Sequence, residues 1–176
     1  MNRIVIRAET ASDHDAIRNL IIEVFHQTYG SGKAEATLVE QLRQMPENGP
    51  TISFVAEIEG VIVGHVFFSG VRLVNHPDIA VCALAPLGVY HQHQKQGIGS
   101  QLVQRGLREC ALQGYKAVFV QGSLEYYPRF GFVPIGGTHL RTIFESDHDM
   151  VLELEKGILS KVSGLADYPT PWHVLK

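Results

Sequence analysis

The sequence is poor in cysteine and carries no marked excess of either charge. Only Cys82 and Cys110 occur among its 176 residues, and their wide separation favours two reduced, buried thiols over the disulfide framework of a small secreted protein. Lysine and arginine number 15 against 18 aspartates and glutamates, which gives a formal net charge of −3. That balance argues against a nucleic-acid partner and against an acidic, solvating tail.

Long apolar runs are also missing. No stretch approaches the roughly 20 apolar residues that span a bilayer, and the opening residues MNRIVIRAET contain no apolar run long enough for a secretory signal. With 45% hydrophobic and 19% charged residues, the composition is that of an ordinary globular domain. We therefore expect a cytoplasmic protein with one core and no membrane partner.

Histidine is plentiful, with nine residues, but the histidines are scattered along the chain. Only His91 and His93 lie close together in sequence, and no spacing matches a metal-ligand motif. We therefore expect no metal site.

Hydrophobic periodicity divides the chain into strands and helices. Segments with a 3.6-residue spacing of apolar positions favour helices, and alternating or short apolar runs favour strands. Pro86 and Gly88 predict a bulge in their strand, because proline removes a ladder donor. The predicted order is strand Ile4–Arg7, a helix up to Gly30–Gly32, helix Lys33–Met45, hairpin strands Ile52–Ile58 and Val61–Ser69, strand Ile79–Tyr90, helix Ile98–Ala111, strand Lys116–Gln121, short helix Leu124–Phe130, a strand from Phe132, strand Met150–Leu154 and tail Lys156–Lys176.

The stretch HQHQKQGIGSQLVQRGLREC, from His91 to Cys110, places Gly97 and Gly99 at the start of a predicted helix. Free backbone N–H groups at a helix start, together with the helix dipole, attract anions. Glycines let a phosphate approach without a side chain in the way. The stretch therefore predicts a phosphate-binding loop, although it has neither the G-x-G-x-x-G of dinucleotide folds nor the Gly-Lys-Ser/Thr of a Walker loop.

Two motifs together resemble the GNAT superfamily of N-acetyltransferases. Gln94 to Gly99 reads Q-x-x-G-x-G, like the loop with which that family binds the pyrophosphate of coenzyme A. Further along, Tyr127 to Phe132 matches the family's Y-x-x-x-G-F block, with Tyr127 on the family's tyrosine. The resemblance covers Ile4–Leu154 and looks most like the bacterial stand-alone branch, whose members end in an apolar tail.

The resemblance implies an α/β fold with a mixed sheet (α+β), the GNAT domain, over residues 1–155. Its central sheet would have about six to seven strands, flanked by helices and splayed at the cofactor. The splayed strands would be Ala83–Tyr90 and Lys116–Gln121. Residues 156–176 would form a C-terminal tail that packs on the domain or on a partner. Whether the chain forms a homodimer is left open.

The resemblance also implies an acyltransferase that moves an acetyl group from acetyl-CoA to a primary amine of a small molecule or a protein by direct attack. Tyr127 would be the catalytic acid for the leaving thiolate, and its neighbour Tyr126 would face the core. The residues implied to bind acetyl-CoA are Leu87, Gly88, Val89, Gln94, Lys95, Gln96, Gly97, Ile98, Gly99, Ser100 and Tyr127.

The general base stays open. Many members of the family carry a glutamate on the strand before the loop, but here that strand reads VCALAPLGVY and has no carboxylate. The candidates elsewhere are His76, Glu125, Glu23 and His26, or a water held by backbone carbonyls. The amine would be received by Phe25–Lys33, the His76 loop and Gly136–His148, where Asp147, His148 and Asp149 cluster.

Two alternatives to an enzyme remain. A non-catalytic acyl-CoA-binding regulatory module would have the same fold, and the missing strand carboxylate favours it. A mononucleotide-binding domain would use the same glycine turn, but the sequence lacks its second acidic or Walker element. Turnover of an amine would distinguish the enzyme from the non-catalytic module. A binding preference among CoA, ATP and NAD would distinguish it from the mononucleotide-binding domain.

Overall fold

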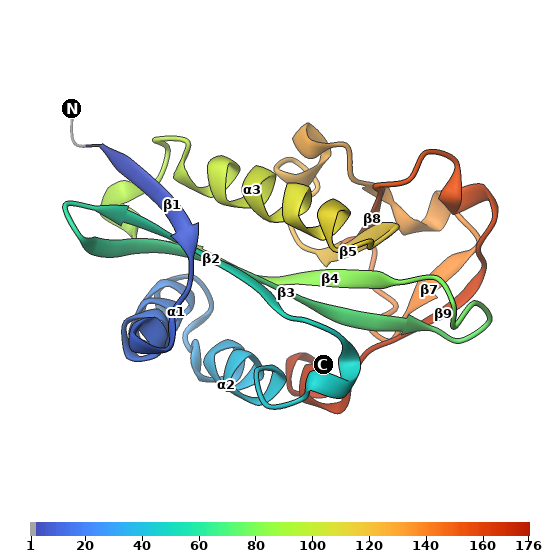
Figure 1. The fold of residues 1–176 in the computed structure, drawn as a ribbon, viewed down its shortest axis with the longest axis horizontal. Coiled ribbons are helices and arrows are strands. Elements are labelled where there is room, and N and C mark those ends of the chain that lie inside the picture. Colours follow the sequence, from blue (N-terminus) through green and yellow to red (C-terminus); the bar gives the residue numbers. More distant parts are fainter. Residues whose placement is uncertain (1–2) are drawn as a thin grey trace.

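A twisted mixed sheet runs through the middle of the protein, with helices on both faces (Figure 1). The computed structural model describes residues 3–176. Seven strands follow the order β1-β2-β3-β4-β5-β8-β6, and β9 pairs with both β3 and β7 beside them, which confirms the predicted mixed sheet. The strands are β1 (Ile4–Ala8), β2 (Ile52–Ile58), β3 (Val61–Leu73), β4 (Val81–Val89), β5 (Ala117–Gln121), β6 (Val133–Pro134), β7 (Leu140–Thr142), β8 (Asp149–Glu153) and β9 (Gly164–Asp167).

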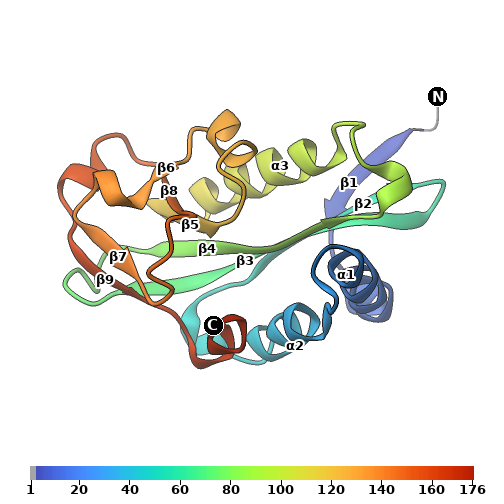
Figure 2. The same ribbon diagram turned by 180° about the vertical axis from the view of Figure 1, so that it is seen from behind.

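Two α-helices cover one face of the sheet and a third covers the other (Figure 1, Figure 2). The α-helices are α1 (His14–Tyr29) and α2 (Lys33–Leu42) on the first face and α3 (Ile98–Leu112) on the second. Short 3-10 helices complete the structure: η1 (Ala11–Asp13), η2 (Pro46–Asn48), η3 (His91–His93), η4 (Tyr127–Phe130), η5 (Ile135–Gly137), η6 (Ile158–Ser160) and η7 (Thr170–Leu175). Within residues 3–176, no helix has the length and apolarity needed to cross a membrane.

Local sequence explains the order of the sheet. The β2–β3 hairpin turns at Glu59 and Gly60, whose φ values of 52° and 79° are both positive, as a type I′ turn requires. β4 and β5 pair in parallel, so the chain must cross over between them, and α3 makes that crossing.

α3 lies close against the sheet because one of its inward positions is a glycine. A Cβ on Gly106 would lie only 2.1 Å from Cε2 of Phe68 in β3, so any side chain there would push the helix away. Leu102 and Val103 are fully buried on the same face. This packing fixes the position of the helix start, where the predicted phosphate loop lies.

The two cysteines meet in this part of the core. Cys82 of β4 and Cys110 of α3 are both fully buried, and their sulfur atoms lie 3.6 Å apart as free thiols. Burial raises the pKa of Cys82 well above its ordinary value, and the neighbouring Cys110 adds to the rise. The prediction of two reduced, buried thiols agrees with this placement.

The C-terminal segment is built into the sheet and the core. β9 pairs antiparallel with the end of β3, where Arg72 lies opposite Asp167 and Leu73 opposite Ala166. After β9, Tyr168 and Trp172 are buried in the core cluster on the α1 and α2 side, and η7 runs beside α2. The indole Nε1 of Trp172 donates a hydrogen bond to Ser69 Oγ at 3.2 Å.

Several predicted boundaries were wrong. β3 continues to Leu73 instead of Ser69, because β4 pairs with Gly70 and Val71, and β9, far along the sequence, pairs with Arg72 and Leu73. α2 ends at Leu42 instead of Met45. After Leu42 the chain forms tighter turns, in which the N–H of Met45 donates a hydrogen bond to the carbonyl oxygen of Leu42. The helix predicted over Leu124–Phe130 is only the single turn η4, whose second residue is a proline without an N–H. The acceptor segment Gly136–His148 contains strand β7.

Candidate active site

β4 and β5 separate halfway along β4. The two strands pair only from Val81 to Leu84 on β4, opposite Ala117 to Val120 on β5. At the same level the β3–β4 register shifts between Val66 and Phe68, which confirms the bulge predicted from Pro86. The rest of β4, to Val89, is therefore paired with β3 but has no strand partner on its β5 side among the described residues.

The loop after β4 leads into α3 with its N–H groups free. Gly97 is the residue before the helix and has φ 80°, in the left-handed region that glycine adopts without strain. The first helical bond runs from Gln101 N–H to Gly97 O at 3.0 Å, so the N–H groups of Ile98 to Ser100 have no helical acceptor. Gln94 ties the loop back to β4, because its Nε2 donates to Val89 O at 2.9 Å.

Gly99 is needed for a different reason. A Cβ at Gly99 would lie 2.9 Å from the hydroxyl oxygen of Tyr126. The two glycines of the loop are therefore required for different reasons. Gly97 adopts the left-handed backbone conformation before the helix, and Gly99 leaves room for Tyr126 from a distant segment.

A cavity of about 530 Å³ opens between the loop, the unpaired end of β4 and the last turns of α1. It brings together eight of the eleven residues predicted to bind the cofactor: Leu87, Val89, Gln94, Lys95, Gly97, Ile98, Gly99 and Ser100. The other wall is formed by Val24, Phe25, Thr28, Tyr29, His93, Tyr126 and Arg129. Tyr29 lies in the segment Phe25–Lys33 that was predicted to receive the amine, whereas Arg129 was not among the predicted site residues.

The remaining three predicted residues lie outside this lining. Gly88 faces α1, where a Cβ would come within 3.1 Å of Leu20 Cδ2, so this glycine allows the helix to approach. The side chain of Gln96 turns back to Gln92, donating to its carbonyl oxygen at 3.3 Å. The third residue, Tyr127, lies behind the cavity wall.

Tyr127 is buried and Tyr126 lines the cavity, which corrects the prediction that Tyr126 faces the core. The ring of Tyr127 packs on Gly122 at the end of β5, where a Cβ would lie 2.6 Å from its Cε2, and contacts Phe132 edge-on. Burial raises the pKa of Tyr127 well above its ordinary value of 10, and the nearby phenols of Tyr126 and Tyr29 raise it further. The phenol therefore stays protonated at neutral pH.

None of the candidate bases lines the cavity. His76 is occupied elsewhere, since its Nε2 accepts a hydrogen bond from Ser163 N–H at 3.1 Å. Nδ1 of His26 lies 2.9 Å from the carbonyl oxygen of Gly30, at the end of α1. Glu23 and Glu125 are exposed. Among the described residues of the lining there is no aspartate or glutamate.

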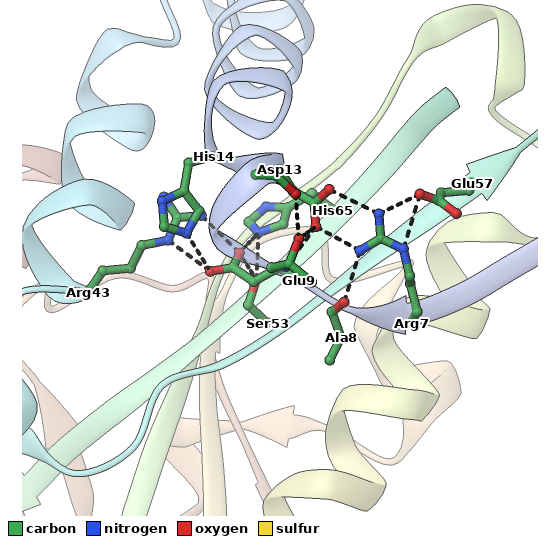
Figure 3. A network of polar contacts seen from close by, with 11 residues as sticks. Arg7, Ala8, Glu9, Asp13, His14, Arg43, Ser53, Glu57 and His65 are labelled. Atoms are coloured by element: carbon green, nitrogen blue, oxygen red, sulfur yellow. Dashed lines mark hydrogen bonds and ion pairs between the residues drawn. The ribbon is translucent and has the colours of Figure 1, made fainter. Parts of the chain in front are cut away.

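A polar cluster outside the lining of this cavity brings together Glu9, Arg43, Ser53 and His65 (Figure 3). Glu9 sits at its centre, accepts two hydrogen bonds from Arg43 at 2.9 and 2.8 Å, and also binds the hydroxyl of Ser53. Nε2 of His65, which is fully buried, lies 2.9 Å from Ser53 Oγ and 3.5 Å from Glu9. These contacts join β1, β2, β3 and the end of α2.

The ion pair between Glu9 and Arg43 is largely buried, because their side chains are only 15% and 12% exposed. Burial alone would raise the pKa of Glu9, but hydrogen bonds from His65, Arg43 and Ser53 outweigh it and lower the pKa from 4.5 to about 2. Burial lowers the pKa of His65, which therefore stays neutral. His65 pairs directly with Gly88 of β4, so the cluster anchors the strand that carries the cavity wall. No local sequence pattern predicts this cluster, because its members are far apart along the chain.

A model of the acetyltransferase (GNAT) family matches residues 14–132, more than half of the chain. The chain belongs to the GNAT family. The family, the fold and the acyltransferase class predicted from the two motifs are thereby confirmed.

Related GNAT proteins match over most of this length. YhbS of Escherichia coli (strain K12), named an uncharacterized N-acetyltransferase, is 34% identical over 167 residues, which are 93% of this chain and 95% of YhbS. YjhQ of the same strain, named in the same way, is 37% identical over 118 residues, and the match spans 66% of this chain and 65% of YjhQ.

Solved GNAT structures agree with the fold. The crystal structure of YhbS in complex with CoA has a TM-score of 0.88 at 32% identity and covers 98% of this chain and 93% of that one. A GNAT acetyltransferase from Brucella melitensis in complex with acetyl-CoA has a TM-score of 0.80 at 26% identity, covering 98% and 99%.

Proposed function

We propose that this GNAT protein transfers an acetyl group from acetyl-CoA to a primary amine of a small molecule or a protein, by direct attack of the amine. The observation that carries the proposal is the cavity in which the unpaired end of β4 meets the free N–H groups of α3. Two similar GNAT proteins, one at 32% and one at 26% identity, hold CoA or acetyl-CoA in their crystal structures.

The cavity suits such a ligand with different groups at its two ends. At the α3 end, free N–H groups and the helix dipole favour a pyrophosphate, and Lys95 and Arg129 add positive charge. At the other end, Leu87 and Val89 lie on the stretch of β4 without a β5 partner, so backbone groups there are available to the amides of the pantetheine arm.

The chemistry requires a neutral amine and a proton for the departing thiolate. Acetyl-CoA supplies the acetyl group already activated as a thioester. We assign the acid to Tyr127, because it carries a phenol proton at neutral pH and its ring packs on Gly122, directly after the end of β5 where the two strands separate. Tyr29, which influences the same phenol from α1, lines the cavity. We assign the base to a water, because no described carboxylate lines the cavity.

One observation favours a second candidate function. The described lining of the cavity offers no aspartate or glutamate to take the proton of the amine. A regulatory module that binds acyl-CoA without turnover would need the phosphate loop and the unpaired strand but no base.

Calorimetric titration of the purified protein with acetyl-CoA, CoA, ATP and NAD tests the binding half of the proposal. We expect acetyl-CoA and CoA to bind and the other two nucleotides not to. Gly97→Glu should abolish binding, because it places a carboxylate at the free N–H groups. Gly157→Glu is the matched control: Gly157 has φ 83° and open space around it, as Gly97 does with φ 80°, but it lies between β8 and η6.

Binding of ATP or NAD in preference to CoA would overturn the proposal. Binding that survives Gly97→Glu would show that the loop is not the phosphate site. An amine screen for released CoA then separates the two candidates, because tight binding without turnover of any amine supports the regulatory module.

A further inference from the structure

The charged and uncharged side chains of the large cavity come from different walls. In its described lining, the cations Lys95 and Arg129 belong to the phosphate loop and to η4. The lining residues that α1 and β4 contribute are all uncharged: Val24, Phe25, Thr28, Tyr29, Leu87 and Val89. The wall of the loop therefore suits phosphate groups, and the wall of α1 suits an apolar body.

Two aromatic rings dominate the α1 wall. Phe25 and Tyr29 are four residues apart on the helix, so their side chains are neighbours, and their ring centroids lie 5.9 Å apart at an interplanar angle of 30°. Phe25 is half-buried and packs against the core, whereas Tyr29 is 74% exposed. The ring of Tyr29 therefore offers open aromatic surface beside the cavity, and Phe25 supports it.

The end of α1 holds these rings in place. Gly30 ends the helix at φ 79°, and its N–H donates to His26 O at 2.8 Å. Nδ1 of His26 lies 2.9 Å from the carbonyl oxygen of Gly30 and closes the same turn. The hydroxyl of Thr28 donates within the helix, to Val24 O at 3.1 Å. An aromatic surface on a capped helix end loses little conformational entropy when a ligand packs on it.

Tyr29 also lies close to the assigned acid. After burial and the phenol of Tyr126, the phenol of Tyr29 is the next cause that raises the pKa of Tyr127. Because the interaction between such groups weakens with distance, Tyr29 lies in the neighbourhood of the group that would protonate the departing thiolate. A ligand packed on the Tyr29 ring would hold its amine near the thioester.

We propose that the acceptor is a primary amine carried by an aromatic ring or a similarly flat apolar body, which packs on Tyr29 and Phe25. The inference rests on the proposed function, since it names the class of amine that the transferase uses. Aromatic rings gain from offset or edge-to-face contact with one another beyond the area that they bury. A second ammonium group, as in a polyamine, would lose hydration against the same uncharged wall.

The test compares three primary amines at saturating acetyl-CoA: phenethylamine, cyclohexylethylamine, which has an aliphatic ring of similar size, and cadaverine, which carries a second ammonium group. We expect kcat/KM to fall in that order, with phenethylamine at least about tenfold above cadaverine. Tyr29→Ala should raise the KM for phenethylamine about tenfold, and Tyr29→Phe, which keeps the ring, should change it less than about twofold. Leu112→Ala removes another exposed apolar side chain, 80% exposed at the end of α3, and should change nothing.

The outcomes separate this inference from the proposed function. Faster turnover of cadaverine than of phenethylamine would overturn the inference and leave the acetyltransferase standing. Equal losses in Tyr29→Phe and Tyr29→Ala would also overturn it, because the hydroxyl rather than the ring would then be the group in use. So would a loss of acetyl-CoA affinity in Tyr29→Ala that matches the rise in KM. Binding of acetyl-CoA without turnover of any amine would overturn the proposed function, and the inference with it.

Discussion

At the scale of single residues, Tyr127 and Tyr126 are adjacent but differ in what surrounds them. The first is buried with its ring on Gly122, and the second reaches over Gly99 to the helix start. Tyr127→Phe removes the assigned acid and keeps the ring packing, so we expect turnover to fall about 100-fold while acetyl-CoA affinity changes little. Tyr126→Phe is the matched control and should affect binding more than turnover. Burial raises the pKa of Tyr127 above 10, so the phenol keeps its proton below that pH. The unaltered enzyme should therefore show no fall in rate below pH 10 that is absent from the profile of Tyr127→Phe. Full activity of Tyr127→Phe would remove Tyr127 from the chemistry.

At the scale of elements, the contact of α3 with β3 sets where the phosphate loop lies. Gly106→Ala improves intrinsic helix propensity but places a Cβ 2.1 Å from the Phe68 ring. Since the ring is fully buried and cannot move away, we expect overpacking to dominate and to lower the free energy of unfolding by about 2 kcal/mol in urea titrations. Phe68→Leu in the same chain should recover part of that loss, because it removes the atoms in conflict. Simple additivity of the two substitutions would mean that the helix relaxes by another route.

At the scale of the whole molecule, stability should depend on acid through Glu9. Its pKa is lowered from 4.5 to about 2, so its ionised form stabilises the fold above pH 4.5, and this contribution is lost as the pH falls toward 2. Glu9→Gln should lower the free energy of unfolding at pH 7 by about 3 kcal/mol, because it leaves the largely buried guanidinium of Arg43 without its charged partner. The difference between the two proteins should narrow below pH 4.5. Glu155→Gln, which removes an exposed ion pair with Lys116, should change little at any pH, and a pH-independent effect of Glu9→Gln would refute the electrostatic account.

Much of this molecule was predictable because its signals are local. Apolar spacing placed α1, α3 and the two hairpin strands, and Pro86 marked the bulge. The loop from Gln94 to Gly99 was found because helix starts and glycines carry their meaning within a few residues. Eight of the predicted cofactor residues line one cavity for the same reason.

The features that were missed depend on contacts between distant segments. The last two residues of β3, Arg72 and Leu73, belong to the strand because β9 pairs with them, and nothing near those residues in the sequence indicates it. The orientation of Tyr126 is set by Gly99 across the loop. The ion pair between Glu9 and Arg43 joins residues on separate elements, each of which looks like an ordinary surface charge when only its neighbours in the sequence are considered.

The buried sulfur atoms give the protein a practical advantage at the bench. Cys82 and Cys110 are the only cysteines of the chain, and both have 0% exposure. A colorimetric thiol reagent added to the folded enzyme should therefore find no reactive group on the protein, so every thiol it counts during an amine screen comes from released CoA. When denaturant is added the same reagent should detect two thiols per chain, so the reagent reports product formation in native buffer and loss of the fold in denaturant.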